Sequence, residues 1–400
     1  MNKILKVYLE KEYIGELIEK DGQRLRFVYD LDAKSDISLR MPRSTQTHYH
    51  KATYAFFENL LPEGNILELI ARGKGVSQNN PFSLLSVIGE DCAGAIHLHQ
   101  YVPLIPEKLP EYISKTELNQ IISGKNNARF IYQKGNRTSL AGARDKTTVI
   151  IKDDKFYAPN FFYPSTHIIK FDNHHFANIL HNELFCTLLA NSLGLSTSKM
   201  ELITENDVPY LLIERFDRAK NPNEIRRLHQ EDFCQLLSVS SKNKYQKEGG
   251  PCFRSVIKTI NEFSYRVASD TLMIAKILVF NVLIGNCDYH GKNLSLLHTT
   301  RSLTPFYDLV STVIYEHIST NMAMSINKKY EVNDINKQDI TNEFNKWGIN
   351  GERMFALIIN DFKHIVKYAQ ALSKETIFTS KQATIFKIIE FIERQFIRLQ

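Results

Sequence analysis

The spacing of hydrophobic residues changes along the chain, and this change limits the folds open to it. In the first hundred residues, short strand-like runs such as Leu5 to Leu9 and Leu25 to Tyr29 alternate with turn signals such as Asp21-Gly22. After the polar stretch from Arg218 to Arg227 the spacing becomes mainly helical. Near the end, hydrophobic residues recur every three or four positions: Ile385, Ile388, Ile389, Ile392, Phe396 and Leu399. The sequence therefore predicts an α+β protein with a mainly helical last part.

A second helical stripe runs from Met354 to Leu372, and a helix is expected around residues 54–61. The 400 residues, 43% hydrophobic and 24% charged, exclude a small disulfide-stapled scaffold and long disorder.

Three prolines between Tyr101 and Pro110 predict a linker. We therefore place domain boundaries at 1–105, 106–217 and 218–400.

The middle part has a recognisable order of elements. Strands are expected over 146–152 and 166–171, then a helix over 173–193 that Gly194 ends, then a strand over 210–216. Strand, strand, helix, strand is the order of the small lobe of a kinase-like fold.

Charge and cysteine usage limit the function only broadly. Fifty Lys and Arg against 44 Asp and Glu leave a net charge of +6, which permits a phosphate-bearing partner without requiring one. The five cysteines are scattered and form no C-x-x-C pair, so we expect a reducing cytoplasm rather than disulfides or a zinc ribbon. The apolar stretch over 272–285 contains Lys276 and Asn281 and is shorter than the ~20 residues of a membrane span, so we expect no membrane segment.

The most informative segment is Gly285 to Asn293, GNCDYHGKN, which follows a predicted buried helix. Asp288 and Asn293 are separated by four residues. Protein kinases use this D-x-x-x-x-N spacing because one loop can then present a carboxylate to the acceptor hydroxyl and an amide oxygen to Mg²⁺. The alternative is that Gly, Asn and Asp here only form turns.

Asp308 lies downstream, beyond a predicted hairpin, where a second acidic metal ligand is expected. Mg²⁺ takes few protein oxygens, so Asn293 and Asp308 would suffice. The alternative for Asp308 is a helix N-cap before Leu309.

Two further features lie upstream. The small residues after Ser139 would let backbone N–H groups approach phosphate oxygens, although an ordinary turn is the alternative. Lys170 resembles the strand lysine that binds nucleotide phosphates, with Glu183 as its ion-pair partner, although both could be solvated surface charges.

Together these segments resemble the HipA family of toxin kinases from bacterial toxin–antitoxin systems. The resemblance extends through nearly the whole chain. Its segments, in order, are FENLLPEG from Phe57, IGEDCAGA from Ile88, SLAGARDK from Ser139, THIIKF from Thr166, Asn182-Glu183, IERFDR from Ile213, HQEDFCQ from His229, GNCDYHGKN from Gly285 and FYDLVST from Phe306.

The resemblance implies a bilobed protein-kinase-like α+β fold with ATP and Mg²⁺ in the cleft. Residues 1–105 would form an N-terminal α+β subdomain, 106–217 a small β-rich N-lobe and 218–400 a mainly helical C-lobe. The implied roles are Asp288 as catalytic base, Asn293 and Asp308 as metal ligands, Lys170 as phosphate ligand, Glu214, Arg215 and Phe216 as the adenine-facing hinge, and Ser139, Leu140, Ala141, Gly142 and Ala143 as the phosphate-binding loop.

Ser139 matches the serine that HipA kinases autophosphorylate. A phosphate there would compete with ATP, so its modification is expected to switch the enzyme off. Arg144 departs from the family, which has Gln at this position, and adds a positive charge near the phosphate path. Within the catalytic loop we assign His290 to loop geometry and Lys292 to the transferring phosphoryl group.

Other signals are weaker. His97-Leu98-His99 is better interpreted as one face of a strand than as a metal site. Cys287 lies beside Asp288, but no Cys/His/Asn arrangement supports a nucleophile, and a buried packing role is preferred.

The resemblance implies a Ser/Thr kinase toxin that phosphorylates an aminoacyl-tRNA synthetase, glutamyl-tRNA synthetase being the best guess, and so causes growth arrest or persistence. A helix-turn-helix, HipB-like antitoxin would neutralise it, in the bacterial cytoplasm or at the nucleoid. The alternative is a corepressor with little kinase turnover that joins the antitoxin on operator DNA. A small-molecule phosphotransferase would share Asp288 and Asn293 but would not explain the N-terminal domain.

Overall fold

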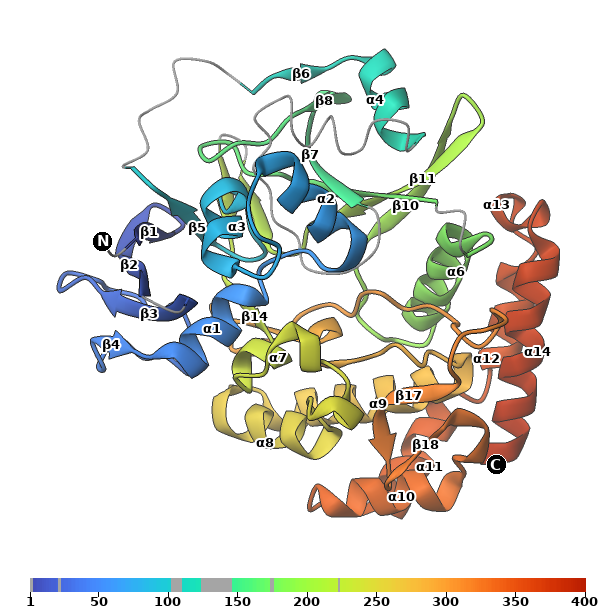
Figure 1. Ribbon diagram of the computed structural model, residues 1–400. Coiled ribbons are helices and arrows are strands. Elements are labelled where there is room, and N and C mark those ends of the chain that lie inside the picture. The colour runs from blue at the N-terminus through green and yellow to red at the C-terminus, as the bar shows by residue number, and fades with distance from the viewer. Residues whose placement is uncertain (1–2, 21–22, 102–109, 124–145, 173–175, 222–223) are drawn as a thin grey trace. The chain divides into compact units, whose positions relative to one another are not determined.

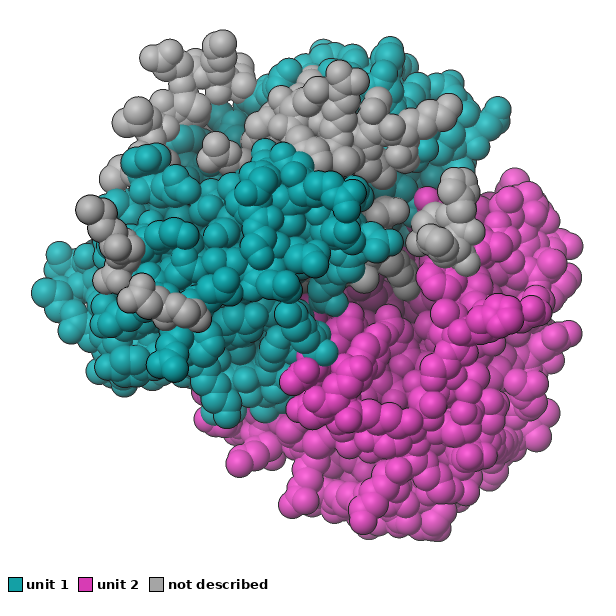
Figure 2. Space-filling view, viewed as in Figure 1, with its two compact units in different colours: residues 1–171, 200–242, 297–300 teal, residues 172–199, 243–296, 301–400 magenta. Residues whose placement is uncertain are grey.

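The computed structural model describes residues 3–20, 23–101, 110–123, 146–172, 176–221 and 224–400 (Figure 1). The chain divides into two compact units, each built from segments that alternate along the sequence (Figure 2). Unit 1 comprises residues 1–171, 200–242 and 297–300; unit 2 comprises residues 172–199, 243–296 and 301–400. Residues 102–109 of the predicted linker lie outside the described residues, and the three-domain division stays a prediction.

Unit 1 begins with an antiparallel five-stranded sheet of order β4-β3-β2-β1-β5. Its strands are β1 (Lys3–Leu9), β2 (Glu12–Lys20), β3 (Arg24–Tyr29), β4 (Thr47–His48) and β5 (Ile96–His99). Three helices follow β4: α1 (His50–Glu58), α2 (Gly64–Lys74) and α3 (Pro81–Ile88). The predicted strands over 5–9 and 25–29 and the strand placement of His97 and His99 are confirmed, whereas β2 is a strand that the sequence analysis did not name.

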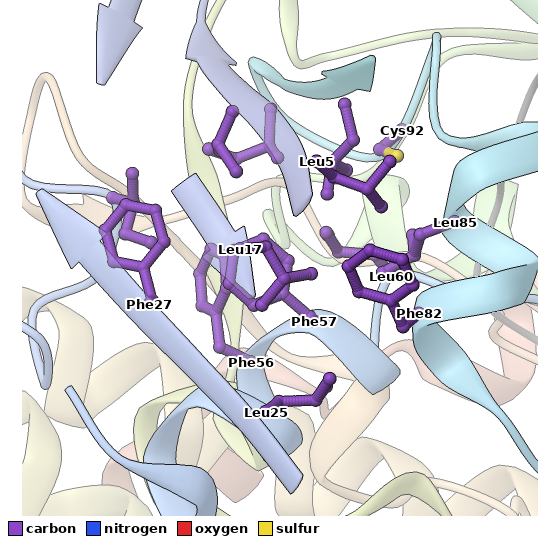
Figure 3. Packing of buried hydrophobic residues seen from close by; sticks show 14 of the residues in the cluster. Leu5, Leu17, Leu25, Phe27, Phe56, Phe57, Leu60, Phe82, Leu85 and Cys92 are labelled. Atoms are coloured by element: carbon purple, nitrogen blue, oxygen red, sulfur yellow. The ribbon is translucent and has the colours of Figure 1, made fainter. Parts of the chain in front are cut away.

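The core of this part lies between the sheet and the helices (Figure 3). Phe27 of β3 packs edge-on against Tyr29 and contacts the Phe57 ring of α1, with ring centroids 4.8 and 5.8 Å apart. Leu60 and Leu61, from the segment FENLLPEG, are buried in the same cluster. This segment therefore has a packing role.

The second sheet of unit 1 has the order β10-β11-β9-β7-β8-β6. Its strands are β6 (Tyr112–Ile113), β7 (Lys146–Lys152), β8 (Lys155–Tyr157), β9 (His167–Phe171), β10 (Met200–Glu205) and β11 (Val208–Glu214). Helix α4 (Lys115–Ile122), with a Ser114/Glu117 capping box, shares a hydrophobic cluster with the sheet. The strands predicted over 146–152, 166–171 and 210–216 are confirmed within two residues at each end.

Unit 1 also contains a hairpin and several short elements. They are β12 (Arg218–Asn221), β13 (Glu224–Arg227), β14 (Gln230–Asp232), α7 (Phe233–Leu236) and the 3-10 helix η2 (Ser241–Asn243), whose last residue belongs to unit 2. The segment HQEDFCQ contributes the Asp232/Gln235 capping box of α7, and Gln235 also donates to the Phe56 carbonyl oxygen at 3.0 Å.

A buried cluster of charges lies deep in unit 1 around Asp91. The Asp91 carboxylate accepts hydrogen bonds from Arg218 at 2.9 Å and from the Ser165 hydroxyl at 2.6 Å, and Arg227 lies 3.5 Å away. The side chain of Asp91 is completely buried. Burial by itself raises the pKa of Asp91, but Arg218, Arg215 and Arg227 more than offset this, so its pKa lies below the usual value.

Arg215 and Asp217 form the other half of this cluster. Arg215 donates to both carboxylate oxygens of Asp217, at 2.9 and 2.7 Å, and to the Cys92 carbonyl oxygen at 3.0 Å. The Gly94 N–H also donates to Asp217, at 2.7 Å. The segments IGEDCAGA and IERFDR, more than a hundred residues apart in sequence, therefore meet in one buried ion network.

Unit 2 is mainly helical, as the sequence predicted. Its helices are α6 (Ile179–Ser192), α8 (Phe253–Phe263), α9 (Val267–Ile284), α10 (Lys337–Lys346), α11 (Gly351–Asp361), α12 (Ile365–Leu372), α13 (Thr376–Thr379) and α14 (Gln382–Leu399). Its strands and 3-10 helices are β15 (Ser295–Leu297), which ends at the border with unit 1, β16 (Ser302–Leu303), β17 (Asn321–Ile326), β18 (Lys329–Glu331), η3 (Gln246–Glu248), η4 (Gly291–Asn293) and η5 (Val332–Asp334).

Two predicted helical stripes have different outcomes. All six apolar residues of the last stripe are buried on α14. The stripe from Met354 to Leu372 was predicted to form one helix. This prediction is wrong, because α11 and α12 are separate helices and Leu357 is 46% exposed. Phe362 and Ile365, which lie at the break between α11 and α12, are both buried. The apolar spacing of the sequence therefore continues across the break although the helix does not.

Helix α9 contains the longest apolar stretch. Within the described residues it alone has the length and hydropathy to cross a membrane, but 67% of it is buried inside the protein. A core helix of a globular unit passes the same test of length and composition. The expectation of a buried helix before Gly285 is therefore confirmed.

We predict that Asp91→Asn lowers the free energy of unfolding by about 3–5 kcal/mol, because three guanidinium groups then face one carboxylate in a buried site. Glu68→Gln, which breaks the exposed pair with Arg72, should cost less than about 1 kcal/mol. Because the folded pKa of Asp91 is lowered, its contribution to stability is present above about pH 4 and is lost as the pH falls further. Denaturant titrations at pH 7 and at lower pH measure both effects, and equal losses for the two variants at pH 7 would contradict the prediction.

Candidate active site

The loop that carries Asp288 begins where helix α9 ends in unit 2. Gly285 ends the helix with a φ of +66°, and a Cβ atom there would lie 2.4 Å from a Val313 methyl group. A side chain therefore fits neither the backbone conformation nor the space. The Gly285 carbonyl oxygen accepts hydrogen bonds from the backbone N–H and hydroxyl groups of Thr312, both at 3.0 Å.

The predicted pair Asp288 and Asn293 lies together in this loop. The side-chain amide of Asn293 donates to the Asp288 carbonyl oxygen at 3.1 Å, and the His290 N–H donates to the same oxygen at 3.0 Å. Because its amide nitrogen is used in this way, Asn293 retains its Oδ1 atom as a candidate metal ligand. The loop is therefore closed by two hydrogen bonds to one carbonyl oxygen, and the catalytic role of its side chains stays a prediction.

Asp308 follows a strand-like segment that is connected to the same loop. The Tyr307 hydroxyl donates to the Lys292 carbonyl oxygen at 2.8 Å, so the neighbour of Asp308 is bonded to the neighbour of Asn293. Asp308 has a φ of +55°, which is uncommon for a residue with a side chain and costs about 1–3 kcal/mol. No helix begins at Leu309, so the N-cap alternative for Asp308 is wrong.

Helix α6 holds the segment after Asp308 through Asn182. The Asn182 side chain donates to the Ser311 carbonyl oxygen and accepts from the Ser311 N–H, both at 2.9 Å. Asn182 is completely buried. In the sequence, Asn182 stands out only through the family resemblance, because hydrogen bonding of a side chain to both sides of a distant backbone residue leaves no signal in residue spacing.

His290 and Lys292 are also buried in unit 2. The His290 ring packs edge-on against the Tyr245 ring at a centroid distance of 5.5 Å. Tyr245 in turn donates its hydroxyl to Asp288 Oδ1 at 2.6 Å. Tyr245 was not predicted from the sequence, because it lies outside the segments quoted for the resemblance, more than forty residues before Asp288.

Cys287 is buried beside Asp288, and its backbone N–H donates to the Thr312 hydroxyl at 2.9 Å. Burial raises the pKa of the Cys287 thiol to about 12, so the thiol stays protonated at neutral pH. A protonated thiol is a weak nucleophile. The expected packing role is supported.

The candidate nucleotide residues belong to unit 1. Lys170 is on β9, with Lys146 of β7 and Leu211 of β11 as register partners. Its neighbours Ile169 and Phe171 belong to the hydrophobic cluster shared with α4, so Lys170 projects from the opposite face of the sheet. Lys170 and Glu183 are both buried, and the alternative of solvated surface charges is therefore wrong.

The three predicted hinge residues end the strand β11 or follow it. Glu214 is the last residue of β11 and pairs with His167, and Phe216 is half-buried. The Arg215 side chain lies in the buried ion network with Asp217, so only the backbone of Arg215 is left for a hinge role. The backbone N–H of Arg215 already donates a hydrogen bond to the Thr166 carbonyl oxygen at 3.0 Å.

The phosphate-loop predictions lie outside the described residues. They are Ser139, Leu140, Ala141, Gly142 and Ala143, together with the family departure at Arg144. Lys170 belongs to unit 1 and Glu183 to unit 2, and their ion pair stays a prediction.

Two models of known families match the chain. The HipA-like C-terminal domain matches residues 138–374 and the HipA N-terminal domain matches residues 5–99. The chain belongs to the HipA family.

Relatives agree with this assignment. The chain is 33% identical over 296 residues to the serine/threonine-protein kinase toxin HipA of Shewanella oneidensis, covering 70% of this chain and 68% of the relative. It is 32% identical over 342 residues to the Sinorhizobium fredii protein Y4mE, covering 82% and 81%.

The fold agrees as well. The structure matches that of HipA from Shewanella oneidensis, solved with HipB and its operator DNA, with a TM-score of 0.85, 25% identity, and coverage of 99% of this chain and 97% of that chain. The predicted α+β kinase-like fold is confirmed.

We predict that Asn182→Ala lowers the free energy of unfolding by about 2–4 kcal/mol, because it leaves a buried N–H and a buried C=O of Ser311 without partners. Asn191→Ala, an exposed asparagine on the same helix, should change it by less than about 0.5 kcal/mol. Urea titrations followed by circular dichroism compare the two. Equal stabilities would show that the Asn182 contacts do not hold the segment after Asp308.

Alkylation tests the environment of Cys287. With iodoacetamide at pH 8, the partly exposed Cys252 should react in the native protein, whereas Cys287 should react only after unfolding, because it is buried and its thiol is protonated. Mass spectrometry of peptides from native and unfolded samples measures this. Native labelling of Cys287 at the rate of Cys252 would contradict the prediction.

Proposed function

We propose that this HipA-family chain is an ATP-dependent serine/threonine protein kinase and the toxin of a toxin–antitoxin module. The observation that carries the proposal is the loop of unit 2, in which Asn293 is bonded to the Asp288 backbone and Tyr307 links this loop to Asp308. The similarity to a relative named as a serine/threonine-protein kinase toxin supports it.

In this proposal Asp288 is the base. It would accept the proton of the acceptor hydroxyl while the γ-phosphoryl group passes to the hydroxyl oxygen and ADP leaves. Asn293 Oδ1 and Asp308 would hold Mg²⁺, which supplies charge neutralisation on the phosphates when bound. An amide oxygen and a carboxylate fit a cation that takes few protein oxygens and otherwise binds water and phosphate.

Lys170 would bind nucleotide phosphate from the face of the sheet opposite α4. Glu214, Arg215 and Phe216 would form the adenine-facing hinge, with Arg215 contributing only its backbone. Lys292 would place its cation near the transferring phosphoryl group, and His290 would maintain the loop geometry. The loop from Ser139 to Ala143 would bind phosphate, and autophosphorylation of Ser139 would switch the enzyme off.

The proposed target is a translation component, with an aminoacyl-tRNA synthetase such as glutamyl-tRNA synthetase as the first to test. Its phosphorylation would cause growth arrest or persistence. A HipB-like helix-turn-helix antitoxin on operator DNA is the proposed partner, because the structure resembles that of a HipA solved with HipB and DNA. The protein would act in the bacterial cytoplasm and at the nucleoid when in complex.

The first test is mass spectrometry of the purified protein after incubation with ATP and Mg²⁺. We expect a phosphate on Ser139 in the wild-type protein, and we expect Asp288→Asn to lower its rate of incorporation by about 10²–10⁴-fold, because the base is lost. Circular dichroism of Asp288→Asn provides the folding control.

A wild-type chain that stays unmodified, hydrolyses no ATP and labels no protein in a cell extract would overturn the kinase proposal. The second candidate function, that of a corepressor, is favoured by the resemblance to the DNA-bound complex. Asp288→Asn distinguishes the two in cells: a kinase toxin loses growth inhibition with this change, whereas corepression with the antitoxin persists.

A further inference from the structure

The hydroxyl of Tyr245 contacts Asp288, the proposed catalytic base. It donates to Asp288 Oδ1 at 2.6 Å, within the range of a charge-assisted O–H···O⁻ hydrogen bond. Among the described residues, Tyr245 is the one whose side chain donates a hydrogen bond to the Asp288 carboxylate. The second oxygen, Oδ2, is thereby left for the acceptor hydroxyl.

The backbone around Tyr245 is closed by hydrogen bonds. The Tyr245 carbonyl oxygen accepts from the N–H groups of Glu248 at 2.9 Å and Gly250 at 3.0 Å. A Cβ atom on Gly250 would lie 2.3 Å from the Asn243 carbonyl oxygen, so only glycine allows the loop to close here. Tyr245 is therefore held by a compact loop.

Strand β17 connects this loop to the catalytic loop. The Ser325 N–H donates to the side chain of Gln246, the residue after Tyr245, at 2.8 Å. Two residues earlier in β17, the Ala323 N–H donates to the Cys287 carbonyl oxygen at 2.8 Å. One strand thus holds the neighbours of both Tyr245 and Asp288, and the Tyr245 ring also packs against His290.

We infer that Tyr245 is a positioning residue that orients the Asp288 carboxylate for proton transfer, an inference that rests on the proposed kinase function. The acceptor O–H bond breaks as its oxygen bonds to the γ-phosphorus of ATP, the proton passes to Asp288 Oδ2, and ADP leaves with the electron pair of the cleaved P–O bond. Tyr245 keeps Oδ1 occupied throughout and itself gives up no proton.

Three sets of contacts hold Tyr245 in place, and they favour a positioning role over a blocking role or a role as phosphate acceptor. A tyrosine that only blocked the site, or that was itself the acceptor, would have to leave Asp288 during turnover. Tyr245 is instead fixed by its closed loop, by its ring contact with His290 and by the link through β17.

The test compares Tyr245→Phe with Tyr265→Phe, which removes the same atom from a tyrosine that is 77% exposed in the same unit. The measurements are the rate constant of phosphate incorporation at saturating ATP-Mg and the ATP concentration for half the maximal rate. For Tyr245→Phe we expect the rate constant to fall about 10-fold, because the base is misoriented, with the half-saturating ATP concentration unchanged within about twofold. Tyr265→Phe should match the wild type in both.

Thermal melting of Tyr245→Phe is the folding control, and the double variant with Asp288→Asn should be no slower than Asp288→Asn alone. An unchanged or increased rate constant, a changed ATP requirement alone, or phosphate on Tyr245 itself would overturn the inference while the proposed kinase function stands. A wild-type protein that transfers no phosphate would overturn both.

Discussion

Burial of charge in unit 1 is the constraint on which much of the architecture depends. Asp91 and Asp217 are almost completely removed from water together with Arg215, Arg218 and Arg227. Such charges are tolerated only when each is paired and hydrogen-bonded, because desolvation otherwise costs several kcal/mol per ion. The segments that carry them, IGEDCAGA and IERFDR, must therefore meet with their partners in place, and this requirement ties the first part of the chain to the strand β11.

Unit 2 uses neutral hydrogen bonds for a comparable purpose. Gly285 ends helix α9 and accepts from Thr312, while Asn182 holds Ser311 in both directions. Asp308, three residues before Ser311, adopts a left-handed backbone. A residue with this φ persists where its surroundings hold it in place, and such positions cluster at functional sites. The strain at Asp308 and the rigidity around it thus agree with a role in binding a ligand.

Family membership and local geometry contribute different parts of the functional argument. Membership of the HipA family directs attention to phosphotransfer and to a partner on DNA. The geometry says which atoms are available: Asn293 through its Oδ1, Arg215 through its backbone and Asp288 through the oxygen that Tyr245 does not occupy. Tyr245 shows the difference most clearly, because it lies within the matched HipA-like domain but in none of the short segments quoted for the resemblance.

The sequence by itself determined several strands of unit 1, the helical character of the last part of the chain, the buried stripe on α14 and the loop with Asp288 and Asn293, because these depend on local periodicity and on short spacings. It also determined the family, through many ordered segments. The tertiary structure alone decided that the stripe from Met354 to Leu372 forms two helices, that Arg215 is an internal ion partner, and that Asn182 and Tyr245 support the loop. These features depend on contacts between residues tens to more than a hundred positions apart, and no periodicity along a chain records which distant groups will satisfy one another's hydrogen bonds and charges.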